Sequence, residues 1–259
     1  ILGSTMFEVI YNGKKIVFTG DLGNSPSPLL KDTEVISDAD YMVMESVYGD
    51  RNHEPQEERE KRFISIVKET VAKRGVLVIP AFSIERTQVI IYELNNLIQA
   101  GKLGFVPVFL DSPLAIKVTR IYKERALKDF NEGVRQIIAE GDDVFNFPNL
   151  HFTLSTEESK KIRDFPSPKI IIAGSGMSSG GRILHHEKNY LPDKRNTLLL
   201  MGYEAAGTLG RQLQDGAKNV TIYGDEVRVE AKIEMISGYS SHKDSDHLID
   251  FVADTKDKV

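Results

Sequence analysis

Cysteine is absent from the 259 residues of this chain. Disulfides and cysteine-ligated metal sites are therefore excluded, and any metal ion would have to be held by His, Asp or Glu, a ligand set that suits zinc, manganese or iron. Long apolar runs are also missing. None approaches the roughly 20 residues that span a bilayer, and residues 1–10 show no signal-peptide pattern. These absences favour a cytoplasmic protein that has no membrane partner.

Positive charge is not in excess either. The chain has 33 Lys and Arg against 38 Asp and Glu, a formal net charge of −5. This balance argues against a surface that coats nucleic acid non-specifically, although a local basic groove stays open. A hydrophobic content of 41% and a charged content of 27% are typical of a globular protein with a buried core, and the length allows one large domain or two ordinary ones.

Short apolar runs alternate with amphipathic segments through the middle of the chain. The runs are too short for helices and are bounded by turn residues, so they predict buried strands at 76–81, 105–110, 169–173 and 197–201. The segments between and around them predict helices at 55–73, 84–99, 114–130 and near 209–214, and a small β-pair at 220–231. This alternation predicts an α/β fold with a doubly wound, mostly parallel sheet. Residues 133–168 show no pattern that places an element.

The two ends of the chain deliver three polar side chains from strand ends. A hairpin at 7–19 leads to Asp21, a short strand at 41–45 ends on Glu45, and a strand that begins near residue 233 leads to His242. The edge formed by the carboxyl ends of parallel strands is where ligands and catalytic groups gather, so we expect the three side chains to converge in one site.

Each of these residues also has a structural explanation when it is taken alone. Asp21 lies between a glycine and a leucine and could be a turn residue, Glu45 could pair with Arg51, and His242 could be a structural histidine. The functional interpretation rests on the set of three, and His247 on the following helix is expected to be solvated.

A glycine-rich turn follows the predicted strand at 169–173 and opens a helix. It begins Gly174-Ser175-Gly176 and ends at Arg182. Such a turn can present backbone N–H groups and serine hydroxyls to a phosphate. Ser179 stands where the dinucleotide-binding fingerprint has its third glycine, and the turn lacks the ending of a P-loop. We interpret it as a site for a phosphodiester backbone; the alternative is a plain tight turn.

Two more strand-to-helix turns carry a serine. One contains Ser83 and Arg86, and the other contains Ser112. In a doubly wound sheet these turns converge with the glycine-rich turn on one edge, where they could line a groove for an extended polar ligand. The alternative is ordinary capping of helices by serine.

Six short motifs occur in order along nearly the whole chain, at residues 18–21, 45–51, 80–86, 174–182, 202–209 and 240–242. Together they resemble the β-CASP branch of the metallo-β-lactamase superfamily. They are most similar to its bacterial and archaeal RNases, which are related to the cleavage-and-polyadenylation endonuclease.

The resemblance implies a β-CASP cap with a doubly wound, mostly parallel sheet, inserted in an incomplete metallo-β-lactamase αββα sandwich. The implied boundaries are 1–49 for the first core segment, 50–240 for the β-CASP domain and 241–259 for the return to the core. The implied activity is zinc-dependent hydrolysis of RNA phosphodiester bonds with two Zn²⁺ ions, and single-stranded RNA would lie in the cleft between the two parts.

The resemblance also implies a role for each site residue. Asp21 matches the aspartate that bridges the two metal ions, Glu45 the acid that orients a histidine, and His242 the histidine that reaches the scissile phosphate. The expected RNA-contacting residues are those of the three turns: Ser83, Arg86, Ser112, Gly174, Ser175, Gly176 and Arg182.

The sequence departs from the family at the metal site. The His-x-His-x-Asp-His motif does not occur in these residues, so Asp21 is the one metal ligand recognised. We therefore expect an interior piece of a longer enzyme, inactive by itself. One alternative is a catalytically silent scaffold that binds RNA or a protein partner, and another is a free-standing protein that binds a small phosphorylated ligand at Gly174. Endo- or exonuclease action, RNA preference and oligomeric state, a homodimer included, stay open.

Overall fold

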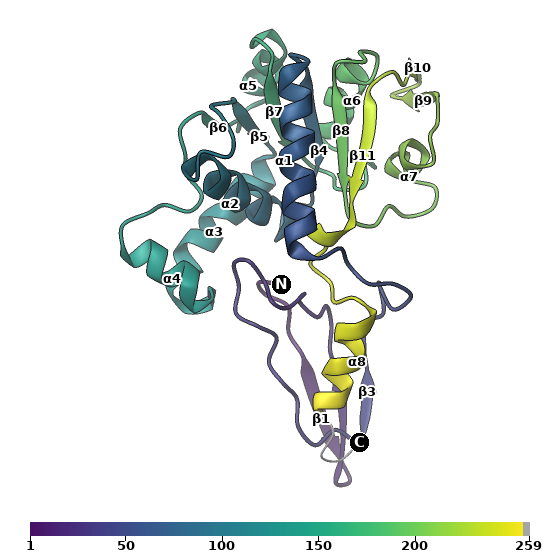
Figure 1. The fold of residues 1–259 in the computed structure, drawn as a ribbon. Helices are drawn as coiled ribbons and strands as arrows, with labels where there is room; N and C mark the ends of the chain where they lie inside the picture. Colours follow the sequence, from purple (N-terminus) through teal and green to yellow (C-terminus); the bar gives the residue numbers. More distant parts are fainter. Residues whose placement is uncertain (256–259) are drawn as a thin grey trace. The chain divides into compact units, whose positions relative to one another are not determined.

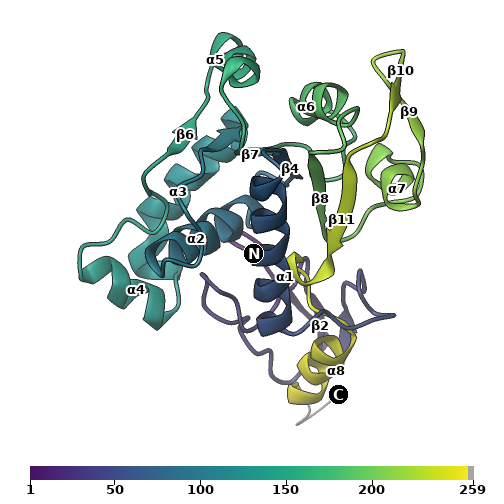
Figure 2. The same cartoon turned by 45° about the horizontal axis from the view of Figure 1, so that its top comes forward.

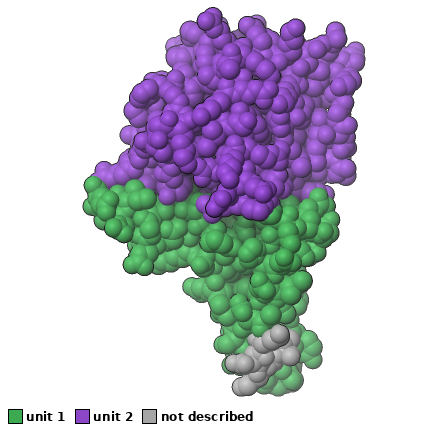
Figure 3. Space-filling model, viewed as in Figure 1, with its two compact units in different colours: residues 1–53, 125–140, 240–259 green, residues 54–124, 141–239 purple. Residues whose placement is uncertain are grey.

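The computed structural model describes residues 1–255 and divides into two compact units, which Figure 3 shows in two colours. Unit 1 contains Ile1–His53, Arg125–Glu140 and the C-terminal segment from Ser240, and unit 2 contains Glu54–Glu124 and Gly141–Tyr239. The domain boundaries expected from the sequence, at 1–49, 50–240 and 241–259, stay a prediction, because compactness does not by itself identify an inserted domain.

The centre of unit 2 is a six-stranded sheet in which every pair of neighbouring strands is parallel. Its order is β11-β8-β4-β7-β5-β6, with β4 at Val76–Pro80, β5 at Val108–Asp111, β6 at Leu150–Phe152, β7 at Lys169–Ala173, β8 at Thr197–Met201 and β11 at Lys232–Ile236. The predicted parallel sheet is confirmed. One strand starts later than predicted, since Pro107 has no backbone N–H for the ladder and β5 begins after it.

Helices cover both faces of this sheet (Figures 1 and 2). Alternate strand residues such as Val78 and Leu200 join the core cluster of Ile183 and Leu213, which belong to α6 (Ile183–Tyr190) and α7 (Leu209–Gln214). The residues of opposite parity are also buried, and on that side lie α1 (Gln56–Ala72) and α2 (Arg86–Gln99). A strand buried on both faces reads as a continuous apolar run, which explains the sequence signal.

The segment that the sequence left unplaced contains short elements. The long α3 (Pro113–Asp129) is followed by α4 (Glu132–Ala139), then β6, α5 (Thr156–Lys161) and the 3₁₀ turn η1 (Ile162–Asp164). Helix α5 starts with a capping box, in which the Ser155 side chain accepts from the Glu158 N–H and the Glu158 side chain accepts from the Ser155 N–H. The Ser-x-x-Glu spacing is a sequence signal that marks this helix start.

A small hairpin joins α7 to the edge strand β11. Strands β9 (Asn219–Ile222) and β10 (Asp225–Arg228) pair antiparallel around the two-residue turn Tyr223-Gly224. The β-pair expected at 220–231 is therefore present, with shorter strands.

Unit 1 is built on a three-stranded sheet. The hairpin of β1 (Phe7–Tyr11) and β2 (Lys14–Phe18) forms as predicted, and β3 (Tyr41–Val43) lies parallel to β2. Helix α8 (Ser245–Asp254) packs on one face, where its apolar side chains meet those of the sheet and loops in a core of Val17, Leu22, Ile36, Ala39, Leu248 and Phe251.

The opposite face of the same sheet is apolar and exposed. Phe7 and Phe18 lie opposite each other in the hairpin, and Val43 lies beside Phe18 on β3; their exposed fractions are 65%, 44% and 55%. A sheet with a helix on one face and an apolar second face corresponds to one half of an αββα sandwich. Within residues 1–255, no helix combines the length and the apolarity that crossing a bilayer requires.

Candidate functional site

Glu45 and His242 meet in unit 1. The Glu45 Oε2 atom lies 2.6 Å from His242 Nδ1, and Glu45 Oε1 accepts a hydrogen bond from the Leu22 backbone N–H. The carboxylate side chain is 7% exposed and the imidazole 27%. Because a carboxylate accepts at Nδ1, the neutral imidazole carries its proton there and Nε2 is left to act on another group. The alternative partner for Glu45, Arg51, bonds Asp50.

The backbone around His242 is also held. His53 donates from Nε2 to the His242 carbonyl oxygen at 2.8 Å, and its own N–H donates to Asp244. Asp244 caps α8 through the His247 N–H and bonds the His247 ring at 2.6 Å, so His247 is not simply solvated. Burial opposes ionisation of Asp244, but the hydrogen bonds from His53 and His247 lower its pKa below the ordinary value. This network fixes where the imidazole points.

Asp21 directly precedes Leu22, whose N–H bonds Glu45, but Asp21 makes a different kind of contact. It follows β2 by three residues and is exposed, and its backbone carbonyl accepts from Ser4 Oγ at 2.6 Å. Its neighbour Leu22 is the residue whose N–H bonds Glu45. The three predicted site residues therefore come together in unit 1, while their chemical roles stay a prediction.

The residues present do not fit a dinuclear metal centre. Within residues 1–255, no group of three or more His, Asp or Glu side chains is placed to hold a metal ion. Each zinc ion needs several protein ligands at fixed distances, and one exposed carboxylate does not provide them.

The three strand-to-helix turns of unit 2 converge as the sequence predicts. Ser83 Oγ and Ser112 Oγ lie 3.5 Å apart, and a Cβ on Gly174 would lie within 3.9 Å of both hydroxyls. Ser112 Oγ also accepts from the Ala115 N–H, so the alternative of helix capping applies to this serine as well. Ser83, Ser112 and Gly174 together form a polar surface, the serine floor, at the carboxyl ends of β4, β5 and β7.

The glycine-rich turn is folded on itself. Ser175 donates its N–H to the Gly180 carbonyl, and its hydroxyl accepts from the Ser179 N–H at 2.9 Å. Gly176 packs on Phe82, where a Cβ would lie 2.6 Å from a ring carbon, and Gly181 packs on the Gly174 carbonyl. These glycines are needed for close packing. Of the serines in the turn, Ser175 and Ser179 reach the surface, whereas Ser178 is buried.

Arg182 is bound to a buried aspartate that sequence reasoning passed over. Its Nη1 atom donates to Asp111 Oδ1 at 2.7 Å and to the Thr153 carbonyl at 3.0 Å, and its Nη2 atom donates to the Leu154 carbonyl at 3.0 Å. Asp111 ends β5 and also accepts from His186 at 2.7 Å and from the hydroxyls of Thr153 and Ser159. The one available signal was an aspartate at the carboxyl end of a predicted strand.

This network decides the charge of Asp111. Burial opposes its ionisation, but the hydrogen bonds from His186, Ser159, Thr153 and Arg182 together hold its pKa well below the ordinary value. Asp111 is fully buried and Arg182 is 21% exposed at the side chain, so part of the guanidinium still faces outward.

Arg86 belongs to a second buried group under the glycine-rich turn. It is 5% exposed, lies over the Phe82 ring, and leaves no room for a side chain at Gly202. Burial raises the pKa of Glu204 to about 7 and of Glu187 to about 8, opposed by Arg86 in the first case and by the Ser178 hydroxyl in the second. Sequence reasoning missed both glutamates, because nothing local marks a buried carboxyl on a helix or loop.

Residues 87–213 match the model of the Beta-Casp domain. This segment belongs to the β-CASP family. The matched β-CASP segment runs from α2 to α7 and contains Ser112, the glycine-rich turn and Arg182. The strands β5, β6, β7 and β8 of the parallel sheet lie in this segment, and the α/β prediction and the metallo-β-lactamase/β-CASP fold are confirmed.

Relatives of known name match almost the whole chain. A protein named ribonuclease from Thermus thermophilus is 36% identical over 96% of the chain, and one named transcription termination factor FttA from Pyrococcus abyssi is 34% identical over 98%. An RNase J-like protein from Methanocaldococcus jannaschii is 33% identical over 97%. The chain spans 57%, 40% and 58% of the lengths of these three proteins.

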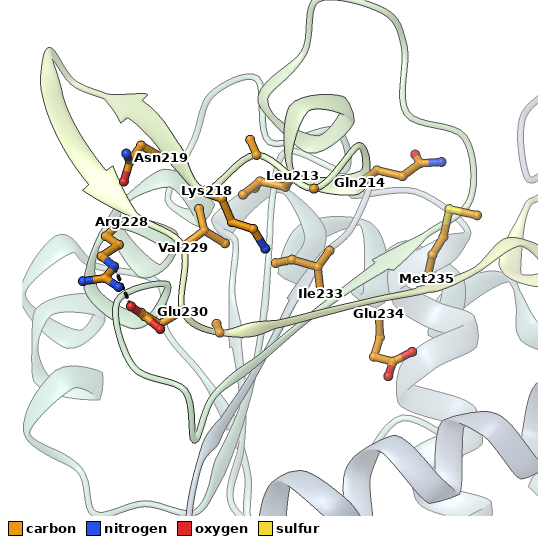
Figure 4. Close-up of a pocket in the computed structure, with 13 residues that line it drawn as sticks. Leu213, Gln214, Lys218, Asn219, Arg228, Val229, Glu230, Ile233, Glu234 and Met235 are labelled. Carbon is orange, nitrogen blue, oxygen red and sulfur yellow. Dashed lines mark ion pairs between the residues drawn. The ribbon is translucent and has the colours of Figure 1, made fainter.

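A cavity of about 570 Å³ lies elsewhere in unit 2, between α7, the β9–β10 hairpin and β11 (Figure 4). Lys218 points into it above the apolar Ile233. None of the site residues expected from the sequence lines this cavity, so it is separate from the serine floor.

Proposed function

We propose that the protein whose reading frame encodes this chain is a nuclease that hydrolyses phosphodiester bonds of single-stranded RNA. The observation that carries the proposal is the contact between Glu45 and His242 at 2.6 Å. A carboxylate that holds Nδ1 leaves Nε2 of the same ring available for proton transfer, which is the arrangement of an oriented acid–base histidine. The printed names of the ribonuclease and the RNase J-like relatives support an RNA substrate.

His242 exchanges a proton with an oxygen of the scissile phosphate or of the leaving group. Glu45 keeps the ring in one tautomer and orientation and, being nearly buried, stabilises the imidazolium that forms during the transfer. The Leu22 N–H and the His53 ring, bonded to Glu45 and to the His242 backbone, keep the pair from rotating.

The serine floor of unit 2 binds the RNA backbone in this proposal. Hydroxyls of the partly exposed Ser83 and Ser175 donate to phosphate oxygens, and the exposed part of Arg182 supplies positive charge. Ser112 is 8% exposed and lies beside Ser83 at the edge of this contact. Arg86 and Gly176 are both buried, so they are proposed to support this surface without contacting RNA themselves. The overall charge of −5 makes a local contact of this kind more plausible than a basic coating.

Zinc dependence is a separate part of the proposal. Two bound zinc ions would polarise the phosphate and activate the attacking water. Asp21 is the ligand that this chain is proposed to contribute. Within residues 1–255 no three-ligand group is found, so the other ligands would have to come from elsewhere.

A catalytically silent scaffold that binds RNA or a protein is the second candidate. It is favoured by the same lack of a three-ligand group within residues 1–255, and one relative is named a transcription termination factor rather than a nuclease. The small-ligand alternative is less favoured, because the N–H groups of Ser175 and Ser179 are used inside the turn.

The deciding experiment uses the product of the complete reading frame that encodes this chain. Labelled single-stranded RNA is incubated with this protein after loading with zinc, beside the Asp21→Ala and His242→Ala variants. We expect cleavage by the parent, none by Asp21→Ala, and a rate lower by about 10²- to 10⁴-fold for His242→Ala, the range assigned to one acid–base group. A folded, zinc-loaded parent that binds RNA without cutting it would establish the scaffold instead.

A further inference from the structure

The chain builds two β-hairpins with the same kind of turn but different residues. In both turns the two central residues have positive φ: 50° and 73° at Asn12-Gly13, and 55° and 83° at Tyr223-Gly224. This is the geometry of a type I′ turn, which favours Asn, Asp or Gly at the first position. Asn12 satisfies that preference. Tyr223 does not, since a bulky side chain is disfavoured in the left-handed region.

The tyrosine ring is nevertheless held in a definite place on the surface. Its centroid lies 4.8 Å from that of the His185 ring, with 32° between the planes. The Tyr223 hydroxyl lies 3.3 Å from His185 Nε2 and 3.5 Å from the Gly181 carbonyl oxygen, to which it donates. An ion pair between Lys188 on α6 and Asp225 on β10 fastens the hairpin beside the helix.

Burial does not explain this arrangement. Tyr223 is 55% exposed and His185 is also exposed, so the pair contributes little to a core. It lies next to the glycine-rich turn, because Gly181, which accepts from the tyrosine, packs directly on Gly174. A strained residue that is kept on the surface, beside a predicted backbone-binding turn, indicates a binding role.

We propose that His185 and Tyr223 form a stacking platform for a nucleobase of single-stranded RNA, next to the Gly174–Arg182 turn. This rests on the proposed RNA substrate. An exposed aromatic face stacks on any base, and neighbouring hydroxyl and guanidinium groups contact the backbone, which is how strand-binding surfaces combine the two contacts. Stacking on the platform contributes to the free energy of RNA binding independently of the phosphate charge.

The test measures binding of fluorescently labelled oligoadenylate to the 259-residue chain over a series of salt concentrations. Tyr223→Ala removes the ring, and Tyr223→Asn removes it while installing the residue that the turn prefers. Tyr223→Phe keeps the ring and loses the hydroxyl. Tyr11→Ala, next to the turn of the other hairpin and 73% exposed, is the matched control. Thermal unfolding of each variant is recorded alongside.

We expect Tyr223→Ala and Tyr223→Asn to weaken binding by about 5- to 100-fold, the scale of one base–aromatic stack. The slope of log K against log salt should stay that of the parent, because stacking releases no counterions. Tyr223→Phe and Tyr11→Ala should bind like the parent. Tyr223→Asn should unfold at the same temperature as the parent or higher, which separates lost stacking from lost folding.

The outcomes distinguish the platform from the substrate on which it rests. A parent chain that binds no single-stranded RNA overturns both the platform and the RNA-binding part of the proposed function. If Tyr223→Ala and Tyr223→Asn bind RNA as tightly as the unmodified chain does, the platform alone is overturned. A change of salt slope in Tyr223→Ala would also overturn it, since the lost contact would then be to phosphate.

Discussion

Glu45 Oε2 and His242 Nδ1 lie 2.6 Å apart although the two residues are 197 positions apart in the chain. The carboxylate receives two donors, the imidazole and the Leu22 N–H, in a site where its side chain is 7% exposed. A buried carboxylate with two donors holds both donor groups in place. Its removal should therefore lower the stability of the fold and release the histidine ring.

Replacing Glu45 by Ala should lower the free energy of unfolding by about 1–3 kcal/mol, because the Leu22 N–H and the His242 ring lose their acceptor. Glu45→Gln keeps one carbonyl oxygen and should lose less. Urea unfolding measures both, with the exposed Glu34→Ala as control, expected within about 0.5 kcal/mol of the parent. Equal stabilities of Glu45→Ala and Glu34→Ala would show that the contact between Glu45 and His242 does not stabilise the fold.

Arg182 has both a structural and a proposed RNA-binding role, and the two are separable. Arg182→Ala should weaken single-stranded RNA binding by about 1 kcal/mol or somewhat more, and should reduce the salt slope by about one unit. Anisotropy titrations at several salt concentrations test this. Arg182→Lys keeps the charge and should keep the slope while it loses the forked contact to Asp111 and Thr153. Unchanged binding by Arg182→Ala at low salt would remove Arg182 from the groove.

The acceptor of that contact should matter more for folding. In Asp111→Asn, an NH₂ group that cannot accept a hydrogen bond replaces one carboxylate oxygen, while Arg182 stays charged beside it. Breaking a buried pair of this kind costs about 3–5 kcal/mol. Denaturant unfolding should show that loss, and a smaller one for Ser159→Ala, since Asp111 keeps its other donors. A loss below that of Ser159→Ala would contradict the central place of Asp111.

Two buried glutamates should make stability depend on pH. Burial raises the pKa of Glu187 to about 8 and of Glu204 to about 7, from an ordinary value of 4.5. Between those values the folded state keeps protons that the unfolded state has released. Their stabilising contribution is therefore complete below pH 4.5 and is lost as the pH rises towards 8.

The Glu187→Gln variant tests this linkage, because Gln cannot ionise. At pH 8 it should be more stable than the parent by at least about 1 kcal/mol, and the difference should shrink towards pH 5. Urea unfolding across this range measures it, with Glu34→Gln as the exposed control. A parent whose stability is flat from pH 5 to 8 would show that neither glutamate has a raised pKa.

The 259-residue chain should neither hold two zinc ions tightly nor cleave RNA. Asp21 is an exposed single carboxylate, and within residues 1–255 no three-ligand group accompanies it. Metal content after dialysis and cleavage of single-stranded RNA are measured together, with the Thermus thermophilus ribonuclease run in parallel. Stoichiometric zinc together with cleavage by the chain would overturn the ligand assignment.

Much of the fold followed from local patterns in the sequence. The apolar runs at 169–173 and 197–201 became β7 and β8 with the predicted bounds, because a strand buried on both faces leaves an uninterrupted apolar signature. The Asn12-Gly13 turn fixed the first hairpin for a reason equally local, its positive φ angles. The segment 133–168 was missed, because its elements are short and alternate without a sustained period.

The sequence by itself determined which residue types stand at the strand ends, and so that Asp21, Glu45, His242 and the serines of the turns were candidates. Only the tertiary structure decided their partners: Glu45 with His242, Arg182 with Asp111, Tyr223 with His185. The physical reason is range. Periodicity and turn preferences act over a few residues, whereas these contacts join positions 38 to 197 residues apart and exist only once the packed elements bring them together.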